Sequence, residues 1–546
     1  MKQNLFCKSL FILSITGLLI TSCSGLTRKT TEDIEEENSQ QQNEDNQAVQ
    51  DEGIGLWSCY GAKYTAYLES IVSQISLEND LKIKHSSKGS MPGVLRESIS
   101  AIATKEYPSM IFGQPDHFAQ YHASKILNKF DSYLIENNLV NDLNDYFSNY
   151  LVENYIYDTD GTKHLYSLPF SRSSEVLVYN GVFVDYCAEK YNDPTLKILP
   201  TTWAEWDQGN DPTTKVGKYY AAFRDLLERR VKLYATQNEE GTATGFTETA
   251  ADGKTLVLDY SDIDLNLTKL MTWDSLDNAF ITLLRQWDAK YTELPADQYE
   301  VNPKRRQGLV LFANDENLPK TISMLKFFNN MYKKGIFGTP ADLGSSFSSD
   351  AFAQGRVMFM ITSSGFAGFA SGNWSKRYRV APIPYSDADH KFVISQGANI
   401  CITKNTTNIN DSYKIIKSLS TGKHQVEWAI KTGYCPVSKT AVNSTEYQAF
   451  LNGTSYDDKN IVLSRETAII NSTEYNRSEK NWISFIDEAF IGSAIVRALV
   501  CYIIPNAFKS VDDVDDDQGY KNVIKTILKD PQIANNPNIA VDSRLV

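Results

Sequence analysis

The fold is decided by residues 54–112, which read IGLWSCYGAKYTAYLESIVSQISLENDLKIKHSSKGSMPGVLRESISAIATKEYPSMIF. Short apolar runs alternate here with stretches whose apolar side chains recur every three or four residues, the spacing of one helix face. The predicted strands are 54–60, 81–85 and 108–112, and the predicted helices are 64–75 and 91–105. This alternation indicates an α/β fold with a parallel sheet.

The carboxyl ends of these strands are the expected ligand site, because open parallel sheets bind ligands there. Tyr60 ends the first predicted strand, and the Ser90-Met91 turn opens the second helix. Gln114 and Asp116 follow the third strand. We therefore expect these residues to line a ligand crevice.

The overall composition is that of a globular protein, with 42% apolar and 22% charged residues among 546. This length allows three or four domains, or two large lobes. The formal net charge is −13. It argues against a nucleic-acid-binding protein, because such a protein gains affinity by neutralising phosphates.

The N-terminus has the features of an export signal, predicted over residues 1–22. An apolar run at 10–22 follows two lysines and is too short to cross a bilayer. It ends in Leu19-Ile20-Thr21-Ser22-Cys23, which resembles the bacterial lipobox. Cys23 is therefore the predicted lipidation site, and an ordinary signal peptide with an incidental cysteine is the alternative.

Residues 23–52 form a predicted disordered acidic tether. Nine acidic residues stand there against two basic ones, and large apolar side chains are almost absent. Such a segment cannot bury enough apolar surface to become ordered. The expected location is the cell membrane, with a lipid-anchored domain facing the periplasm or the extracellular side. No later stretch has the length of apolar sequence that a membrane span needs.

Motifs for catalysis, metals and cofactors are weak in this chain. The six histidines form no HExxH pattern, and the glycines form neither a phosphate loop nor a dinucleotide motif. No cofactor and no metal are therefore predicted, although 67 acidic residues leave paired catalytic carboxylates open. The cysteines after the tether are Cys59, Cys187, Cys401, Cys435 and Cys501. Their odd number and the lack of a CxxC spacing favour buried free thiols over a disulfide framework.

The middle of the chain is more helical than its start. Apolar helix faces are predicted over 276–287 and 322–332. Residues 236–272 are rich in Thr, Gly and Asp around a strand-like segment at 255–258. We interpret 236–272 as a surface insertion, such as a hairpin.

Four segments carry a resemblance to a known family. They are LYSLPFSRSSEVLVYN at 165–180 with the turn PTTW at 200–203, FAQGRVMFMI at 352–361 leading into TSSG at 362–365, SQGANICI at 395–402, and TGYCPVSK at 432–439. In this order, behind a lipobox, they resemble bacterial extracellular solute-binding proteins of carbohydrate-type ABC transporters. The resemblance spans about 54–510 and is strongest to the branch with sugar and glycerol-3-phosphate binders.

The resemblance implies a two-lobed, type II periplasmic-binding-protein-like α/β fold with a ligand cleft between the lobes. It also implies hinge crossings near residues 170, 395 and 445. The first lobe is predicted at 53–170 and 395–445, and the second lobe at 171–394 with C-terminal helices and a tail at 446–546. Closure of the cleft would need contacts that only the closed state makes.

Sugar-like ligands offer C–H faces to aromatic rings and hydroxyls to polar side chains. The aromatic candidates are Trp57, Tyr60, Trp203, Trp374 and Tyr434, and the polar or turn candidates are Gln114, Asp116, Ser171, Arg172, Glu175, Ser363, Ser364, Gly397 and Asn399. Ligand contact is favoured for Trp203 and Tyr434, whereas a structural role is favoured for Trp57 and Trp374. Glu175 fits a ligand contact or an interlobe salt bridge equally well.

Two arginines bear on the class of ligand. A phosphate is recognised by arginine forks or helix N-terminal amides. If Arg172 or Arg497 lines the cleft, an anionic ligand is favoured. Arg497 lies in the apolar segment 495–500, where a buried structural arginine is the more usual reading.

The predicted function is capture of a carbohydrate or related polyol by lobe closure, without covalent chemistry. The expected partners are a small sugar-like ligand and the permease of an ABC importer, and the protein is expected to be a monomer that binds no nucleic acid. A glycerol-3-phosphate or glycerophosphodiester binder is the nearest alternative. A secreted glycan-degrading enzyme, with two carboxylates about 5–9 Å apart, and an adhesin with a filled cleft are alternatives of other classes.

Overall fold

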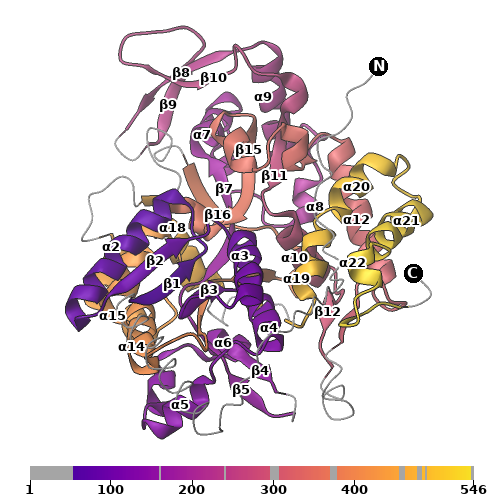
Figure 1. The fold of residues 1–546 in the computed structure, drawn as a ribbon. Coiled ribbons are helices and arrows are strands. Elements are labelled where there is room, and N and C mark those ends of the chain that lie inside the picture. Colours follow the sequence, from indigo (N-terminus) through magenta and orange to yellow (C-terminus); the bar gives the residue numbers. More distant parts are fainter. Residues whose placement is uncertain are drawn as a thin grey trace, which may run out of the picture. The chain divides into compact units, whose positions relative to one another are not determined.

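The computed structural model describes residues 53–158, 161–238, 241–295, 307–368, 378–453, 462–475, 483–485 and 489–542. The predicted signal peptide, Cys23, the acidic tether and Trp374 lie outside these residues. The described chain builds two large β-sheets, each with its own helices and its own hydrophobic core, and three smaller sheets (Figure 1). This arrangement confirms the predicted two-lobed α/β fold.

The first lobe contains a five-stranded sheet in the order β2-β1-β3-β18-β6. The strands are β1 (Ile54–Ser58), β2 (Ile83–Ser87), β3 (Met110–Gly113), β6 (Ser167–Pro169) and β18 (Asn399–Ile402). β1 is parallel to β2 and β3, whereas β18 is antiparallel to β3 and β6. The predicted alternation of strands and helices is confirmed, with the second strand two residues later than expected.

Helices α2 (Ala62–Asn79) and α3 (Met91–Thr104) form where the apolar spacing predicted them. The buried side chains of α2 include Leu68, Val72 and Ile75, which lie on one face of the helix. The Ser90 side chain caps α3 by accepting from the Gly93 amide at 3.1 Å. A Cβ on Gly93 would lie 2.2 Å from the Lys88 carbonyl oxygen, so only glycine fits there.

Later parts of the chain complete this lobe. Its remaining elements are α4 (Pro115–Ala123), α5 (Phe130–Glu136), α6 (Ser148–Leu151), β4 (Tyr155–Tyr157), β5 (Lys163–Leu165), α14 (Ile409–Ser420) and α15 (Gly422–Thr432). Although α14 and α15 lie far from α2 in the sequence, both pack against it (Figure 1). Helices α16 (Lys439–Val442) and α17 (Thr445–Leu451) share a small third core with α15 and α18 (Val462–Ile469).

The second lobe contains a sheet in the order β14-β11-β15-β7-β17-β19, with β16 also paired to β7. Its strands are β7 (Ser173–Asn180), β11 (Lys269–Trp273), β14 (Phe337–Gly338), β15 (Val357–Ser363), β16 (Tyr378–Pro382), β17 (Phe392–Gln396) and β19 (Ile483–Phe485). Strand β15 is parallel to β11 and antiparallel to β7. β7 and β15 are almost wholly buried, and each contains a continuous apolar run, at 176–179 and at 357–361.

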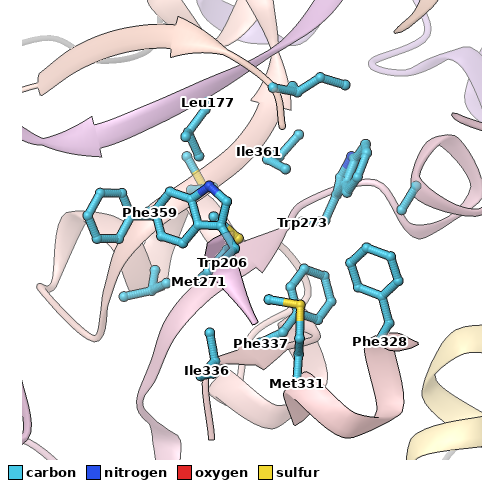
Figure 2. Close-up of a cluster of buried hydrophobic side chains, with 14 of the residues drawn as sticks. Leu177, Trp206, Met271, Trp273, Phe328, Met331, Ile336, Phe337, Phe359 and Ile361 are labelled. Carbon is cyan, nitrogen blue, oxygen red and sulfur yellow. The ribbon is translucent and has the colours of Figure 1, made fainter. Parts of the chain in front are cut away.

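Helices surround this sheet and seal a core of aromatic and sulfur-containing side chains. They are α7 (Gly181–Lys190), α8 (Trp203–Trp206), α9 (Lys215–Glu228), α10 (Leu276–Gln286), α12 (Leu318–Lys333), α13 (Ser348–Ala353), α19 (Ser493–Val500), α20 (Ile503–Ser510), α21 (Asp517–Leu528) and α22 (Pro531–Ala534). Figure 2 shows Trp206, Trp273, Phe337 and Phe359 gathered in this core, where each is fully buried. The C-terminal helices α19 and α20 pack on α10 and α12.

The predicted insertion forms a small antiparallel sheet of β8 (Lys232–Gln237), β9 (Ala243–Thr247) and β10 (Thr255–Asp259). Its predicted end at 272 is wrong, because residues 269–273 form β11 of the second sheet. Leu270 and Met271 are fully buried there. Strand β11 was not predicted because the residues before it are mostly polar. A further small sheet joins β12 (Thr292–Glu293), β13 (Gly308–Val310) and β20 (Ile539–Ala540).

In the described residues, the chain passes between the two large sheets three times, and the first two passages are neighbours. The first passage runs from β6 to β7, and the second from β17 to β18. The two passages are held together by pairing of Ser395 with Ser174 and of Gln396 with Ser173. Both coincide with crossings predicted near 170 and 395. The third passage lies between β18 and β19, and the crossing predicted near 445 falls within this stretch.

The five cysteines of the described residues are free thiols, and all but Cys501 are buried. Burial raises the pKa of Cys59, Cys401 and Cys435 to about 12, so these thiols stay protonated. Among the described residues, no helix combines the length and apolar character needed to cross a membrane.

Candidate ligand pocket

A pocket with about 430 Å³ of empty space, partly open to solvent, lies beside the first two passages. Its lining comes from both lobes and from the second passage: Gln114, Pro115, Asp116, Glu153, Arg172, Ile394, Ser395, Gln396, Gly397, Ala489, Ser493 and Arg497. Of the predicted site residues, Gln114, Asp116, Arg172 and Gly397 are therefore brought together. Half of these twelve residues carry charged or amide side chains.

Gln114 and Asp116 lie where the first sheet presents its carboxyl end. Gln114 directly follows β3, and α4 begins at Pro115. Proline fits the first helical position because no helical hydrogen bond uses its missing N–H. The Asp116 carboxylate accepts from the His117 amide at 3.0 Å. The start of α4 thus offers the pocket one amide side chain and one carboxylate.

Arg172 is almost completely buried, with its side chain 2% exposed. Its Nη2 contacts Glu153 and donates to the Tyr150 carbonyl at 3.1 Å and to Asn399 Oδ1 at 3.2 Å. Asn399 Nδ2 donates to Glu153 Oε1 at 2.7 Å, which closes a network of three side chains. Arg172 Nε and Nη1 have no hydrogen-bond partner among the described residues. The network fixes the guanidinium through Nη2 and leaves the other two nitrogens without a hydrogen bond to a described residue.

Arg497 also lines the pocket, which corrects the expectation of a buried structural arginine. Helix α19 starts at Ser493, and Ser493 and Arg497 are four residues apart on one face. Arg497 Nε donates to Asp277 Oδ2 at 2.7 Å, and Nη2 contacts Asn278. The apolar residues of α19 pack into the hydrophobic core of the second lobe instead. The sequence pattern alone did not show that Arg497 lies on the helix face of Ser493, towards the pocket.

Gly397 lines the pocket, whereas Asn399 and Ser171 are buried beside lining residues. Asn399 is fully buried in its network with Arg172 and Glu153. Ser171 is also fully buried, and its hydroxyl lies 3.3 Å from the Tyr60 hydroxyl. A Cβ on Gly397 would lie 1.8 Å from the Ser171 carbonyl oxygen. Gly397 therefore allows the first two passages to approach each other closely.

Glu175 lies inside the second lobe rather than on the pocket. Its Oε1 accepts from Trp273 Nε1 at 2.8 Å, and its Oε2 has no hydrogen-bond partner among the described residues. Burial raises the pKa of this carboxyl to about 8, and the nearby Asp277 carboxylate adds to the rise. Glu175 is therefore mainly protonated at neutral pH, which argues against the predicted interlobe salt bridge.

The raised pKa of Glu175 predicts a pH dependence of stability. The folded protein holds this proton more tightly than the unfolded chain, whose carboxyl has an ordinary pKa of 4.5. Its contribution is therefore complete below about pH 4.5 and is lost as the pH rises towards about 8, at up to about 1.4 kcal/mol per pH unit. Glu175→Gln should remove this slope and gain stability relative to the native protein between pH 5 and pH 8.

Urea unfolding at pH 5, 6.5 and 8 measures this effect. Glu97→Gln is the matched control, because Glu97 is 46% exposed. An unchanged slope in Glu175→Gln would contradict a buried protonated carboxyl.

Tyr60 and Tyr434 belong to an aromatic cluster of the first lobe and do not line the pocket. The Tyr60 ring lies 4.7 Å from the Trp428 ring, and Tyr434 stacks on Trp428 at 6.0 Å. This cluster meets the second lobe at Gly365, where a Cβ would lie 2.7 Å from the Tyr434 ring. The Tyr64 hydroxyl donates to the Gly365 carbonyl as well. The cluster thus serves contact between the lobes in this conformation.

Ser363 and Ser364 lie directly before Gly365, where the two lobes are in contact. Ser364 Oγ accepts from the Ser174 amide at 3.3 Å, and Ser363 Oγ accepts from the Gly365 amide at 3.2 Å. Both hydroxyls therefore hold the short 3-10 turn Ser364–Gly368 that follows β15. Neither serine lines the pocket.

Trp203 lies in the hydrophobic core, which corrects the prediction of a sugar platform. The side chain is 1% exposed. Its ring stacks on Trp273 at 6.1 Å and meets Phe328 edge-on at 4.8 Å, and its Nε1 donates to Gln286 Oε1 at 2.7 Å. The preceding Thr202 caps α8 through a capping box with Glu205. The turn at 200–203 therefore starts a helix, and the buried indole leaves almost no surface for a ligand.

Several lining residues were missed by sequence reasoning. Ile394, Ser395 and Gln396 immediately precede the predicted crossing residue Gly397, so a wider window around the crossing would have included them. Glu153, Ala489 and Ser493 carry no local signal, because they reach the pocket only through long-range folding.

The sequence matches a protein family over most of its length. Residues 70–451 fit the model of a family described as bacterial extracellular solute-binding protein. The chain belongs to this family. Similar relatives include the sn-glycerol-3-phosphate-binding periplasmic protein UgpB of Escherichia coli K12 and of Shigella dysenteriae. Each is 24% identical over 404 residues, which are 73% of this chain and 77% of the relative.

Solved structures share the family fold with this chain. UgpB from Mycobacterium tuberculosis, in complex with glycerophosphocholine, has a TM-score of 0.59 at 15% identity and covers 87% of this chain and 97% of its own. The GacH receptor of Streptomyces glaucescens, solved unliganded and with acarbose, has a TM-score of 0.58 at 13% identity and covers 87% and 98%. These likenesses agree with the two-lobed architecture.

Proposed function

We propose that this family member captures a carbohydrate or related polyol between its lobes and delivers it to the permease of an ABC importer. The observation that carries the proposal is the position of the pocket. Both lobes contribute to its lining, and it lies beside the passages about which the lobes would move. A ligand bound there would contact both lobes and favour their closed arrangement.

The chemistry of the lining supports a hydroxyl-rich ligand. Gln114 offers an amide, Asp116 a carboxylate and Arg172 a guanidinium. Each of these planar groups carries two or more hydrogen-bonding atoms, which suits neighbouring hydroxyls of a polyol. The proposal involves no covalent step, and the protein would act as a monomer.

The lobe boundaries follow the predicted scheme in this proposal. Residues 53–170 and 395–445 would move as one lobe, and 171–394 with 446–546 as the other. The interlobe contact between Tyr64 and Gly365 would then break when the cleft opens.

A ligand panel tests the function. Thermal unfolding with neutral sugars, polyols and glycerophosphates should show a raised Tm for one ligand class, because a ligand that binds only the folded state stabilises it. Absence of any shift, together with unchanged tryptophan fluorescence, would contradict the proposal. Release of new reducing ends from an oligosaccharide would support the glycan-degrading enzyme instead.

A glycerophosphate is the second candidate ligand. The relatives named sn-glycerol-3-phosphate-binding protein, and the presence of Arg172 and Arg497 in the lining, favour it. Neutral sugars and glycerophosphates are therefore separate arms of the panel.

We also propose that Cys23 anchors the protein to the membrane through a lipid. Cys23→Ala should move the protein from the membrane fraction to the soluble extracytoplasmic fraction, because the lipid attachment atom is lost. Immunoblots of the two fractions measure this shift, with Cys7→Ala as the matched control. Retention of Cys23→Ala in the membrane fraction would contradict lipidation at this residue.

A further inference from the structure

The two lobes are in contact at the turn η6 (Ser364–Gly368), which follows β15 of the second lobe. This turn packs against β7 of its own lobe and against α15 of the first lobe. Its Gly365 is buried, and the Tyr64 hydroxyl of α2 donates to the Gly365 carbonyl. The Tyr64 side chain is buried as well. A hydrogen bond from the first lobe to the second therefore lies inside this contact.

The Tyr64 hydroxyl has one acceptor within reach in each lobe. Besides the Gly365 carbonyl in the second lobe, the Thr432 carbonyl at the end of α15 lies 3.2 Å from the hydroxyl in the first lobe. A tyrosine hydroxyl carries one proton, so it donates fully to one acceptor at a time. When the lobes part, the hydroxyl keeps a partner in its own lobe. Opening therefore leaves no unpaired donor at Tyr64, which keeps the free-energy cost of opening small.

The backbone of η6 also lies directly against the aromatic cluster of the first lobe. A Cβ on Gly365 would lie 2.7 Å from the Tyr434 ring, which is closer than a carbon atom tolerates. The centroid of that ring lies 6.0 Å from that of Trp428 and 6.1 Å from those of Tyr60 and Tyr64, so the ring has little room to move. The lobes approach this closely because residue 365 has no side chain.

We propose that Tyr64 and Gly365 form a latch that holds the two lobes together before any ligand binds. The hydrogen bond from Tyr64 stabilises the closed arrangement, and the missing side chain at Gly365 permits it. Because the hydroxyl has a second acceptor in the open arrangement, the latch biases the equilibrium between the two arrangements without locking it. A ligand between the lobes favours the same closed arrangement, so ligand and latch strengthen each other. That consequence rests on the proposed function, whereas the latch itself does not.

Single-molecule fluorescence energy transfer on the full-length protein without ligand tests the latch. Dyes are attached through azide-bearing amino acids that replace Arg96 in α3 and Glu228 in α9, one exposed position in each lobe. Tyr64→Phe removes the hydroxyl and keeps the ring. We expect the ratio of closed to open molecules to fall about fivefold, the effect of one hydrogen bond.

Gly365→Ala is a second variant that acts on the other half of the latch. The φ of Gly365 is not positive, so alanine fits the backbone of the open arrangement. In the closed arrangement its Cβ would meet the Tyr434 ring. We expect at least the same fivefold shift towards open molecules. Adding Tyr64→Phe should then have little further effect, because the bond between the lobes is already broken and coupled positions are not additive.

Tyr67→Phe is the matched control for Tyr64→Phe. Tyr67 lies about one turn further along α2, is partly exposed, and has its ring centroid 6.4 Å from that of Tyr64. The ammonium of Lys431, also in the first lobe, lies over its ring at 5.5 Å. Loss of the Tyr67 hydroxyl leaves the bond to Gly365 in place, so the closed-to-open ratio should stay at the native value.

Three results would overturn the latch. They are a native ratio in Tyr64→Phe, an equal shift in Tyr67→Phe, and additive effects of Tyr64→Phe and Gly365→Ala in the double variant. None of these measurements uses a ligand. Failure of the latch therefore leaves the solute-binding function standing, and a ligand panel without any response overturns that function but not the latch.

Discussion

Trp203→Ala is expected to lower the free energy of unfolding by about 3–5 kcal/mol. The indole fills the space between Trp273 and Phe328, and its removal leaves a cavity that the surrounding sheet and helices cannot close. The Gln286 side-chain oxygen also loses the donor at Trp203 Nε1. Urea unfolding of the native protein and the variant measures the change.

Trp57→Ala is the matched control for this prediction. Trp57 is only partly buried in β1, with the Lys88 ammonium over its ring at 3.9 Å. Its loss should destabilise the protein by less than half as much as that of Trp203, because less apolar surface returns to water. A Trp203→Ala variant that keeps native stability but loses ligand affinity would restore the platform role that the sequence suggested.

Arg172→Gln alone is expected to destabilise the protein by about 3–5 kcal/mol. The change leaves the Glu153 carboxylate, with its side chain 5% exposed, buried without its cation. Asn399 remains as a hydrogen-bond donor to Glu153 but carries no charge. Chemical denaturation in the absence of ligand measures this loss.

The double variant, Arg172→Gln with Glu153→Gln, is compared with the single variant Arg172→Gln. Replacing both members of a buried ion pair is often close to neutral, so most of the lost stability should return. If the single variant is as stable as the native protein, Glu153 is not held as a buried charge. The network with Asn399 would then need another explanation.

Local patterns along the chain were sufficient for much of the fold. The apolar spacing of α2 and α3 and the buried runs of β7 and β15 depend on neighbours a few residues away. Strand β11 was missed because it is short and follows a polar segment. Pairing with β14 and β15, which lie far along the chain, makes it a strand.

The candidate site was harder to predict from local patterns. Gln114 and Asp116 were found because the end of a parallel strand is a position that topology defines. Arg172 and Gly397 were found through the resemblance of the crossings. Trp203 was misassigned because a tryptophan after a turn looks the same whether it faces a ligand or a core. Glu153 and Ser493 had no signal of any kind.

The sequence by itself determined the class of fold, the crossings near 170 and 395 and the membership of a solute-binding family, because apolar periodicity and short motifs are local properties. Only the tertiary structure decided which aromatic rings are core, and which charges meet at the pocket. Arg172 and Arg497 are 325 positions apart in the chain and belong to elements that face the same pocket only after both sheets have formed. Burial then decides what each group can do, since Arg172 Nε and Nη1 have no hydrogen-bond partner among the described residues and Glu175 stays mainly protonated.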